Sequence, residues 1–270
     1  MGVVNLTPDS FSDGGQFANG TAARDHALRL LDAGADWLDL GGESTRPGAA
    51  PVSEAEELAR VLPVLEAILT ARPTALMSID TMKPGVARAA VQAGARMWND
   101  VTALRFAPES LETAAELGVE TVLMHMQGAP QTMQANPHYD NVVTEVIGFL
   151  QARVAAARAA GIPTERLWVD PGIGFGKTLA HNLALMAATE RIIAETGRPL
   201  LFGASRKRFI AALDPSEPSA ERRLGGSLAA ALYAARAGAR MVRVHDVAET
   251  VQALKVQAAI LADDGRREPG

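Results

Sequence analysis

The chain opens with Met1-Gly-Val-Val-Asn-Leu-Thr-Pro-Asp-Ser-Phe-Ser-Asp-Gly-Gly15, and this stretch sets the plan of the fold. Its short apolar run has the length of a buried strand and ends at Asn5. The Thr-Pro-Asp-Ser segment and the Gly-Gly pair that follow have the composition of a loop. Parallel α/β proteins build binding sites in this way, because a rigid strand positions one polar group and the loop supplies others.

The same order of helix, small-residue turn and apolar strand recurs along the chain. The segment 21–33 carries a helical stripe of apolar residues and ends at Ala33-Gly34-Ala35, after which the segment 36–40 is a predicted strand. The remaining predicted strands are 76–79, 96–98, 121–124, 167–169, 200–202 and 241–244. Eight strands, each plausibly followed by a helix, predict an α/β fold with one (β/α)8 TIM barrel domain over residues 1–270. A doubly wound sheet would need a Gly-rich phosphate turn after the first strand, which is absent.

Composition narrows the possible functions. The 270 residues include no cysteine, which excludes disulfides, zinc-thiolate sites and thiol nucleophiles and agrees with a cytoplasmic protein. The formal net charge of -5 argues against a general nucleic-acid binder. No apolar run is long enough to span a bilayer, and the amino end lacks a basic-then-apolar leader, so we expect neither membrane insertion nor secretion.

Polar residues follow nearly every predicted strand. In a barrel the carboxyl ends of the strands surround one mouth, where catalytic and binding residues gather. Polar residues also resume at strand ends without any site, but eight such ends in a row favour a site. These ends carry Asn5, Gly41-Gly42-Glu43-Ser44-Thr45-Arg46, Asp80, Asn99-Asp100, His125, Asp170, Ser205-Arg206-Lys207, Arg243 and His245.

Spacing sharpens the interpretation of some of these residues. Arg243 and His245 stand two apart, so on one strand their side chains share a face, and a buried arginine requires an anion. Asp170 precedes a Pro-Gly turn, and Asp80 precedes Thr81. Carboxylates inside a barrel mouth bind metals or paired N–H donors.

Other candidates have ordinary structural explanations. His125 lies between two methionines, which is more typical of a packed histidine than of a catalyst. Asp36 and Asp39 are equally explained as polar groups at a helix-to-strand junction. The segment 172–178 resembles a nucleotide P-loop, but that motif requires glycine where Pro171 stands. We therefore interpret this segment as a loop whose glycines let the backbone approach a flat ligand.

Eight motifs together resemble the dihydropteroate synthase family, the folate-pathway enzymes that join a dihydropterin methyl diphosphate to 4-aminobenzoate. The resemblance covers almost the whole chain and implies a barrel with the pterin deep in its mouth. The motifs are the opening stretch to Gly15, Gly41-Gly-Glu-Ser-Thr-Arg-Pro-Gly48, Ser78-Ile-Asp-Thr81, Asn99-Asp100, Leu123-Met-His-Met-Gln-Gly128, Asp170-Pro-Gly-Ile-Gly-Phe-Gly-Lys177, Ser205-Arg-Lys207 and Arg243-Val-His-Asp246.

The resemblance assigns roles to individual residues. It implies catalytic roles for Asp80, Lys207, Arg243 and His245. It implies pterin contacts from Asp80, Asn99, Asp170 and Lys207, and diphosphate contacts from Asn5, Thr45, Arg46, Arg243 and His245. For 4-aminobenzoate the expected contacts are Phe11, Arg46, Pro47, Phe175, Lys207 and Arg208.

The family further implies a Mg²⁺ ion on Asn5, a homodimer, and loss of diphosphate to leave a methylene cation that the arylamine captures. The chemistry of the residues agrees, because the Asp170 carboxylate can accept two parallel bonds from the pterin amino group and ring N–H. One amide oxygen is a weak metal site, so most Mg²⁺ ligands should be diphosphate oxygens and waters.

The sequence departs from the family in two places. It begins inside the first strand, whereas family members usually carry a segment ahead of it, and Arg208 stands where many members have a serine thought to receive the benzoate carboxylate. Arg208 can pair with that carboxylate or point to solvent. Two other functions compete: a pterin-binding corrinoid methyltransferase would lack the opening loop and Ser205-Arg-Lys207, and an inactive barrel would have lost Asn5, Arg46 or Lys207.

Loop composition predicts an order of binding. The segments 6–17 and 44–52 are rich in Gly, Pro and Ser, so we expect loops that are mobile when the site is empty. Pterin diphosphate and Mg²⁺ would order them and so complete the slot for 4-aminobenzoate and sulfonamides.

Overall fold

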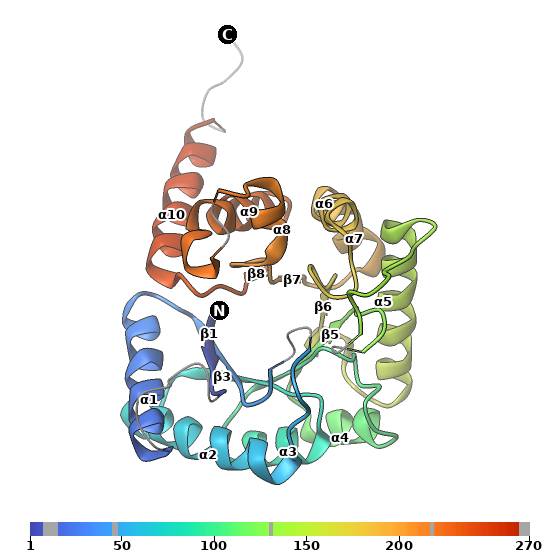
Figure 1. The fold of residues 1–270 in the computed structure, drawn as a ribbon. Coiled ribbons are helices and arrows are strands. Elements are labelled where there is room, and N and C mark those ends of the chain that lie inside the picture. Colours follow the sequence, from blue (N-terminus) through green and yellow to red (C-terminus); the bar gives the residue numbers. More distant parts are fainter. Residues whose placement is uncertain (8–15, 45–47, 130–131, 217–218, 265–270) are drawn as a thin grey trace.

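The computed structural model describes residues 1–7, 16–44, 48–129, 132–216 and 219–264 (Figure 1). Eight parallel strands alternate with helices along the chain. The strands are β1 Gly2–Asn5, β2 Trp37–Gly41, β3 Leu76–Asp80, β4 Met97–Asp100, β5 Glu120–Met124, β6 Leu167–Asp170, β7 Leu201–Phe202 and β8 Met241–Val242. The α-helices among the described residues are α1 Gln16–Asp32, α2 Glu54–Ala71, α3 Pro84–Gln92, α4 Ser110–Leu117, α5 Val142–Ala159, α6 Leu179–Ala187, α7 Thr189–Thr196, α8 Arg208–Leu213, α9 Leu224–Arg236 and α10 Val247–Asp264, with short 3-10 turns at Thr164–Arg166 and Ala220–Arg222.

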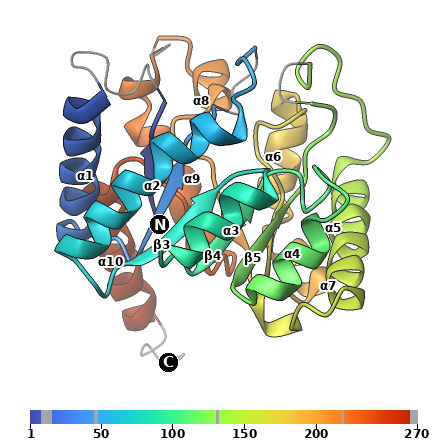
Figure 2. The same cartoon turned by 90° about the horizontal axis from the view of Figure 1, so that it is seen from below.

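The strands close into a barrel through two narrow seams. Strands β1 to β6 form one sheet in sequence order, and β7 pairs with β8. A parallel bridge between Val169 and Leu200 joins the two sheets on one side, and a bridge between Gly2 and Val244 joins them on the other. At the second seam the Val3 N–H donates to the Val244 carbonyl over 3.0 Å. The helices lie outside this ring of strands (Figures 1 and 2).

Apolar side chains fill both the shell around the barrel and its floor. Leu38 and Leu40 of β2 are fully buried in the main core, which also takes residues from the helices. A second small cluster contains Met1, Met97, Val122 and Leu201, three of which lie at or before the first residue of a strand. This layer closes the amino end of the barrel, so polar side chains gather at the carboxyl end.

The predicted barrel is confirmed, with shifted element ends. Asp80, Asn99 and Asp170 lie inside their strands and not beyond them, because each still takes part in the ladder with its neighbouring strand. The last strand is shorter than predicted, although Val244 pairs across the seam.

The predicted loop 6–17 is wrong at its end, because helix α1 begins at Gln16, ahead of the predicted helix 21–33. The predicted mobility of residues 8–15 and 45–47 lies outside the described residues. Within the described ranges, no helix has both the length and the apolarity needed to cross a bilayer.

Candidate active site

Arg243 occupies the centre of the barrel mouth. Its Nε donates to Asp39 Oδ2 over 2.6 Å and its Nη2 donates to Asp80 Oδ2 over 2.8 Å. Burial, opposed by Arg243 and reinforced by Asp39, raises the pKa of Asp80 to about 7. Burial alone would lower the pKa of Arg243, but the two carboxylates outweigh it and raise this pKa. The mouth therefore holds a guanidinium between two carboxylates.

Asp39, for which a helix-to-strand junction was an equally good explanation from the sequence, is a member of this site. It is fully buried, and its Oδ2 also accepts a 3.0 Å bond from Asn99 Nδ2. Its Oδ1 has no hydrogen-bond partner among the described residues. A signal was available, because Asp39 alternates with Leu38 and Leu40, and in a barrel strand such alternation directs the polar residue inward.

Asp170 and Lys207 are the second group of charged residues in the mouth, and Lys207 bonds to the turn that follows Asp170. Asp170 ends β6, and its Oδ1 accepts a 2.6 Å bond from the Gly172 N–H. Burial raises the pKa of Asp170, while Lys207 lowers it. Lys207 Nζ donates to the Ile173 carbonyl and lies 4.6 Å from the centre of the Phe175 ring. Burial, opposed by Asp170, lowers the pKa of Lys207 to about 8.

The turn that carries Lys207 is held from both sides. Arg206 has a left-handed backbone with φ 59°, which is costly for a residue with a side chain. Its guanidinium pairs with Asp246, and its N–H donates to Ser227 Oγ over 2.9 Å. Ser205 Oγ lies 3.0 Å from Nδ1 of His245. These contacts connect the Ser-Arg-Lys motif to the segment that carries Arg243 and His245.

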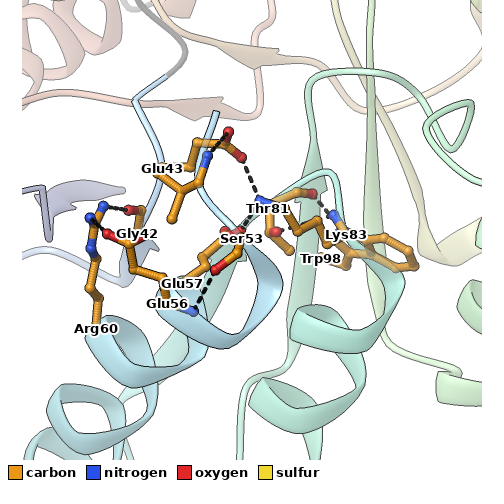
Figure 3. A network of polar contacts seen from close by, with 10 residues as sticks. Gly42, Glu43, Ser53, Glu56, Glu57, Arg60, Thr81, Lys83 and Trp98 are labelled. Carbon is orange, nitrogen blue, oxygen red and sulfur yellow. Dashed lines mark hydrogen bonds and ion pairs between the residues drawn. The ribbon is translucent and has the colours of Figure 1, made fainter. Parts of the chain in front are cut away.

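A buried network lies under the loop that follows β2 (Figure 3). Lys83 Nζ donates to Glu43 Oε2 over 2.7 Å and to Glu57 Oε2 over 2.5 Å. Glu43 Oε1 accepts a 3.0 Å hydrogen bond from the Val52 N–H. This bond joins the two ends of the segment 43–52. Burial alone would lower the pKa of Lys83, but its bonds with Glu43 and Glu57 raise it. Gly42 allows this approach, because a Cβ there would meet the Glu57 side chain at 2.9 Å.

The other residues that the sequence predicted for the site differ in burial and in their contacts. Asn5 ends β1 beside Gly41, half-buried. Phe175 is half-buried beside Lys207, whereas Arg208 is exposed at the start of α8 and has no hydrogen bond or ion pair to another described residue. Phe11, Thr45, Arg46 and Pro47 lie outside the described residues, so their predicted contacts stay predictions.

The structure thus brings the two halves of the predicted pterin site into one mouth. Asp80, Asn99 and Arg243 belong to one connected set, and Asp170 with Lys207 belongs to the other. Carboxylates and cations so arranged can accept paired N–H donors and hold an anion side by side.

Comparisons with known proteins agree on one family. Residues 1–245 match the family described as pterin binding enzyme. The dihydropteroate synthase of Escherichia coli K12 is 48% identical over 268 residues, which cover 99% of this chain and 93% of that protein. The structure of Xanthomonas albilineans dihydropteroate synthase with 4-aminobenzoic acid is 53% identical, with a TM-score of 0.91, and 97% of this chain and 92% of that one are covered. The Yersinia pestis enzyme with a sulfonamide drug is 47% identical, with a TM-score of 0.90 and coverage of 97% and 94%.

Proposed function

This chain belongs to the pterin-binding enzyme family, and from that premise we infer that it condenses (7,8-dihydropterin-6-yl)methyl diphosphate with 4-aminobenzoate, giving 7,8-dihydropteroate and diphosphate. It is therefore a transferase of folate biosynthesis and a sulfonamide target. The observation that carries this function is the placement of Asp170, with Lys207 bonded to the turn that follows it, beside the Asp39–Arg243–Asp80 set in one barrel mouth. A corrinoid methyltransferase is disfavoured, since the relatives that match nearly the whole chain are synthases.

The pterin half of the substrate fits the residues of the inner mouth. Asp170 is the acceptor for the pterin amino group and the neighbouring ring N–H, which donate in parallel to one carboxylate. Asp80 and Asn99 meet the remaining ring edge, and Lys207 faces the carbonyl side. Asp170 and Asn99 are each 5% exposed, so a ligand bound there loses its contact with bulk water and its polar groups need these partners.

Arg243 and His245 bind the diphosphate group of the substrate in this proposal. Arg243 uses Nε and Nη2 for Asp39 and Asp80, and a guanidinium has five N–H donors, so others remain for phosphate oxygens. Thr45 and Arg46 complete this group in the proposal. Positive charge at this position stabilises the charge that develops on the leaving diphosphate, which accelerates its departure.

Mg²⁺ is the proposed cofactor, with Asn5 as its protein ligand. No cluster of three or more His, Cys, Asp or Glu side chains suited to a metal occurs in the described part of the chain. The residues therefore fit a Mg²⁺ ion only if diphosphate oxygens and waters supply most ligands, which is common for this ion. When bound, the ion would add positive charge at the leaving group.

The second substrate would approach from the outer side of Lys207. Phe175 and Lys207 offer a ring face and a cation, and Phe11, Arg46, Pro47 and Arg208 are the further proposed contacts. The bond between the methylene carbon and the diphosphate oxygen breaks, the carbon bonds to the amine nitrogen, and the amine loses one proton. This chemistry requires no protein nucleophile.

We also propose that the enzyme is a cytoplasmic homodimer and that residues 1–270 act as one domain. Its lack of cysteine suits a reducing compartment. The seam between Gly2 and Val244 joins distant parts of the chain into one barrel.

The proposed dimer has a candidate surface on α10. Val256 and Ile260 of α10 are more than half exposed beside α9, and a second copy would cover them. Sedimentation of wild type and of Val256→Lys/Ile260→Lys measures this; equal masses for the two proteins would contradict it.

Diphosphate release tests the catalytic proposal. With dihydropterin methyl diphosphate, Mg²⁺ and 4-aminobenzoate, diphosphate and 7,8-dihydropteroate should form in equal amounts. Without 4-aminobenzoate, the release should be much slower. Release at the same rate with or without the arylamine, and without dihydropteroate, would show that the protein is a hydrolase and not a synthase.

A further inference from the structure

Lys177 is a buried cation that the proposed reaction does not use. It is 3% exposed, at the end of the turn that follows Asp170. Its ammonium donates to the Phe175 carbonyl over 3.0 Å and to the His125 carbonyl over 3.3 Å, and it lies 2.9 Å from His125 Nδ1. Three acceptors match the three N–H donors of an ammonium group.

His125 is present as a neutral acceptor. Burial, together with Lys177 and Arg105, lowers the pKa of His125 to about 3. The ring packs edge-on against Phe149 with 4.9 Å between the ring centres. A neutral imidazole that accepts at Nδ1 carries its proton on Nε2. The packed histidine indicated by the sequence thus has a partner, Lys177, that the sequence analysis did not identify.

The Lys177 ammonium lies next to the turn that anchors the Asp170 carboxylate. Gly172 connects the two, because its N–H donates to Asp170 Oδ1 and a Cβ on it would stand 3.4 Å from Lys177 Nζ. The same Cβ would stand 1.9 Å from the His125 carbonyl oxygen, so only glycine fits between the two loops. Besides Lys177, the cations that lower the pKa of Asp170 are Lys207 and Arg243.

We propose that Lys177 is a positioning residue for pterin binding, whose ammonium, held by His125 and Phe175, fixes the turn after Asp170 and supplies positive charge near its carboxylate. This inference rests on the proposed function, in which Asp170 accepts the pterin N–H groups. In the proposed function Lys207 and Arg243 contact the substrates, whereas Lys177 is 3% exposed and its ammonium contacts protein acceptors. Its contacts with the protein therefore do not depend on a bound substrate.

The pH dependence of pterin binding separates this role from a purely structural one. Burial, opposed by Asp170 and aided by Lys207, lowers the pKa of Lys177 to about 7, so the ammonium persists below pH 7. Asp170 must be ionised to accept two N–H bonds, so pterin affinity is lost as the pH falls through the Asp170 pKa. We call this loss of affinity at low pH the acid limb. Without the Lys177 charge the acid limb moves to higher pH by roughly one unit, since a nearby cation lowers a carboxyl pKa by about 1 to 3 units.

Calorimetric titration of a pterin that lacks diphosphate, from pH 5 to 7, tests the proposal. Lys177→Met and Lys177→Gln should both shift the acid limb upward and weaken binding about fivefold at the wild-type midpoint, approaching tenfold at lower pH. Lys177→Gln keeps a hydrogen-bond donor without the charge, so it gives the result if the methionine variant does not fold. Tyr139→Phe is the matched control, because Tyr139 holds the same turn through a 2.8 Å bond to the Gly176 carbonyl without a charge. It should lower thermal stability and leave the acid limb in place.

Two results would overturn different claims. If wild type binds pterin but the foldable Lys177 variants keep its acid limb, Lys177 has only a structural role. An equal shift in Tyr139→Phe would assign the effect to the turn and not to the charge, which also contradicts the inference. If wild type binds no pterin, the proposed function itself fails.

Discussion

Asp39 and Arg243 are 204 residues apart in the chain, yet Arg243 Nε lies 2.6 Å from Asp39 Oδ2 inside the barrel. Asp39 contributes no exposed surface, so it reaches a substrate only through its neighbours. Those neighbours are Arg243 and Asn99, one expected to hold diphosphate and the other the pterin. One carboxylate thus orients a residue from each half of the substrate site.

Asp39→Asn should lower kcat/KM by on the order of 10²-fold, because small misplacements of reacting groups cost about that much. The amide keeps an acceptor for Arg243 but removes the charge. Steady-state kinetics and urea unfolding measure the two effects. Asp36→Asn, an exposed change one residue before the same strand, is the control and should match wild type. Full activity in Asp39→Asn would show that Arg243 keeps its position without this partner.

Asp170→Asn should abolish pterin binding. The amide offers one acceptor where the ligand presents two donors, and its own NH₂ group would face a donor. An unmatched buried polar group costs about 1 to 3 kcal/mol, and more when a charge is involved. Calorimetry with a pterin that lacks diphosphate measures the loss. An affinity within twofold of wild type would contradict the assignment of Asp170 as the acceptor.

Lys207 should give pterin binding an alkaline limb near pH 8, where burial has placed its pKa. Above that pH the folded protein loses the proton that the unfolded chain holds up to about pH 10.4. The unfolded state then binds more protons, so the contribution of Lys207 to stability rises with pH while pterin affinity falls. Lys207→Met should bind pterin and 4-aminobenzoate more weakly at pH 7 and match wild-type pterin affinity near pH 10. The ligand ionises equally in both titrations, so a constant difference across the range would refute this prediction.

Arg208→Ala should raise the KM for 4-aminobenzoate about two- to fivefold and weaken sulfonamide inhibition, with unchanged pterin affinity. The modest size follows from its exposure, since an exposed ion pair contributes at most about 1 kcal/mol. Arg208→Ser introduces the residue that many family members carry and should restore the wild-type KM. If neither KM nor inhibition changes in the alanine variant, Arg208 points to solvent and takes no part in binding.

Lys83→Met should destabilise the fold by about 3 to 5 kcal/mol, because Glu43 and Glu57 would remain buried without their cation. In the wild type the raised Lys83 pKa means that this stabilisation is fully present below the unfolded pKa and is lost only as the pH rises through the folded value. Urea unfolding at pH 7 measures the change. Lys83→Met/Glu57→Gln should recover part of it, since one buried charge is removed. A single variant within about 0.5 kcal/mol of wild type would show that the cluster relaxes by another route.

Local patterns were sufficient to predict the barrel. Each strand is a short apolar run after a small-residue turn, and these signals depend only on neighbouring residues. The start of α1 was missed because Gly20 and the Gly-Gly pair before Gln16 weaken the local helix signal.

Long-range pairs were harder to foresee. Glu57, one of the two partners of Lys83, lies 26 residues away on α2, and spacing carries no information about such a contact. The burial of Glu57 could have been predicted, because Glu57 falls on the buried stripe of α2 with Val61, Val64 and Ile68. A charged residue on an apolar stripe needs a counter-ion, but only the fold shows which one it takes.

The seam between Gly2 and Val244 has a consequence for folding during synthesis on the ribosome. Synthesis proceeds from the amino end, so β1 to β6 emerge long before the residues that close the ring. Until the last strands arrive, a sheet formed by β1 to β6 has two open edges, which other chains can pair with. Asp39 and Asp80 also lack the cation that they share in the complete structure until Arg243 is translated. Closure of the ring therefore removes both edges and brings the guanidinium between the two carboxylates in a single late event.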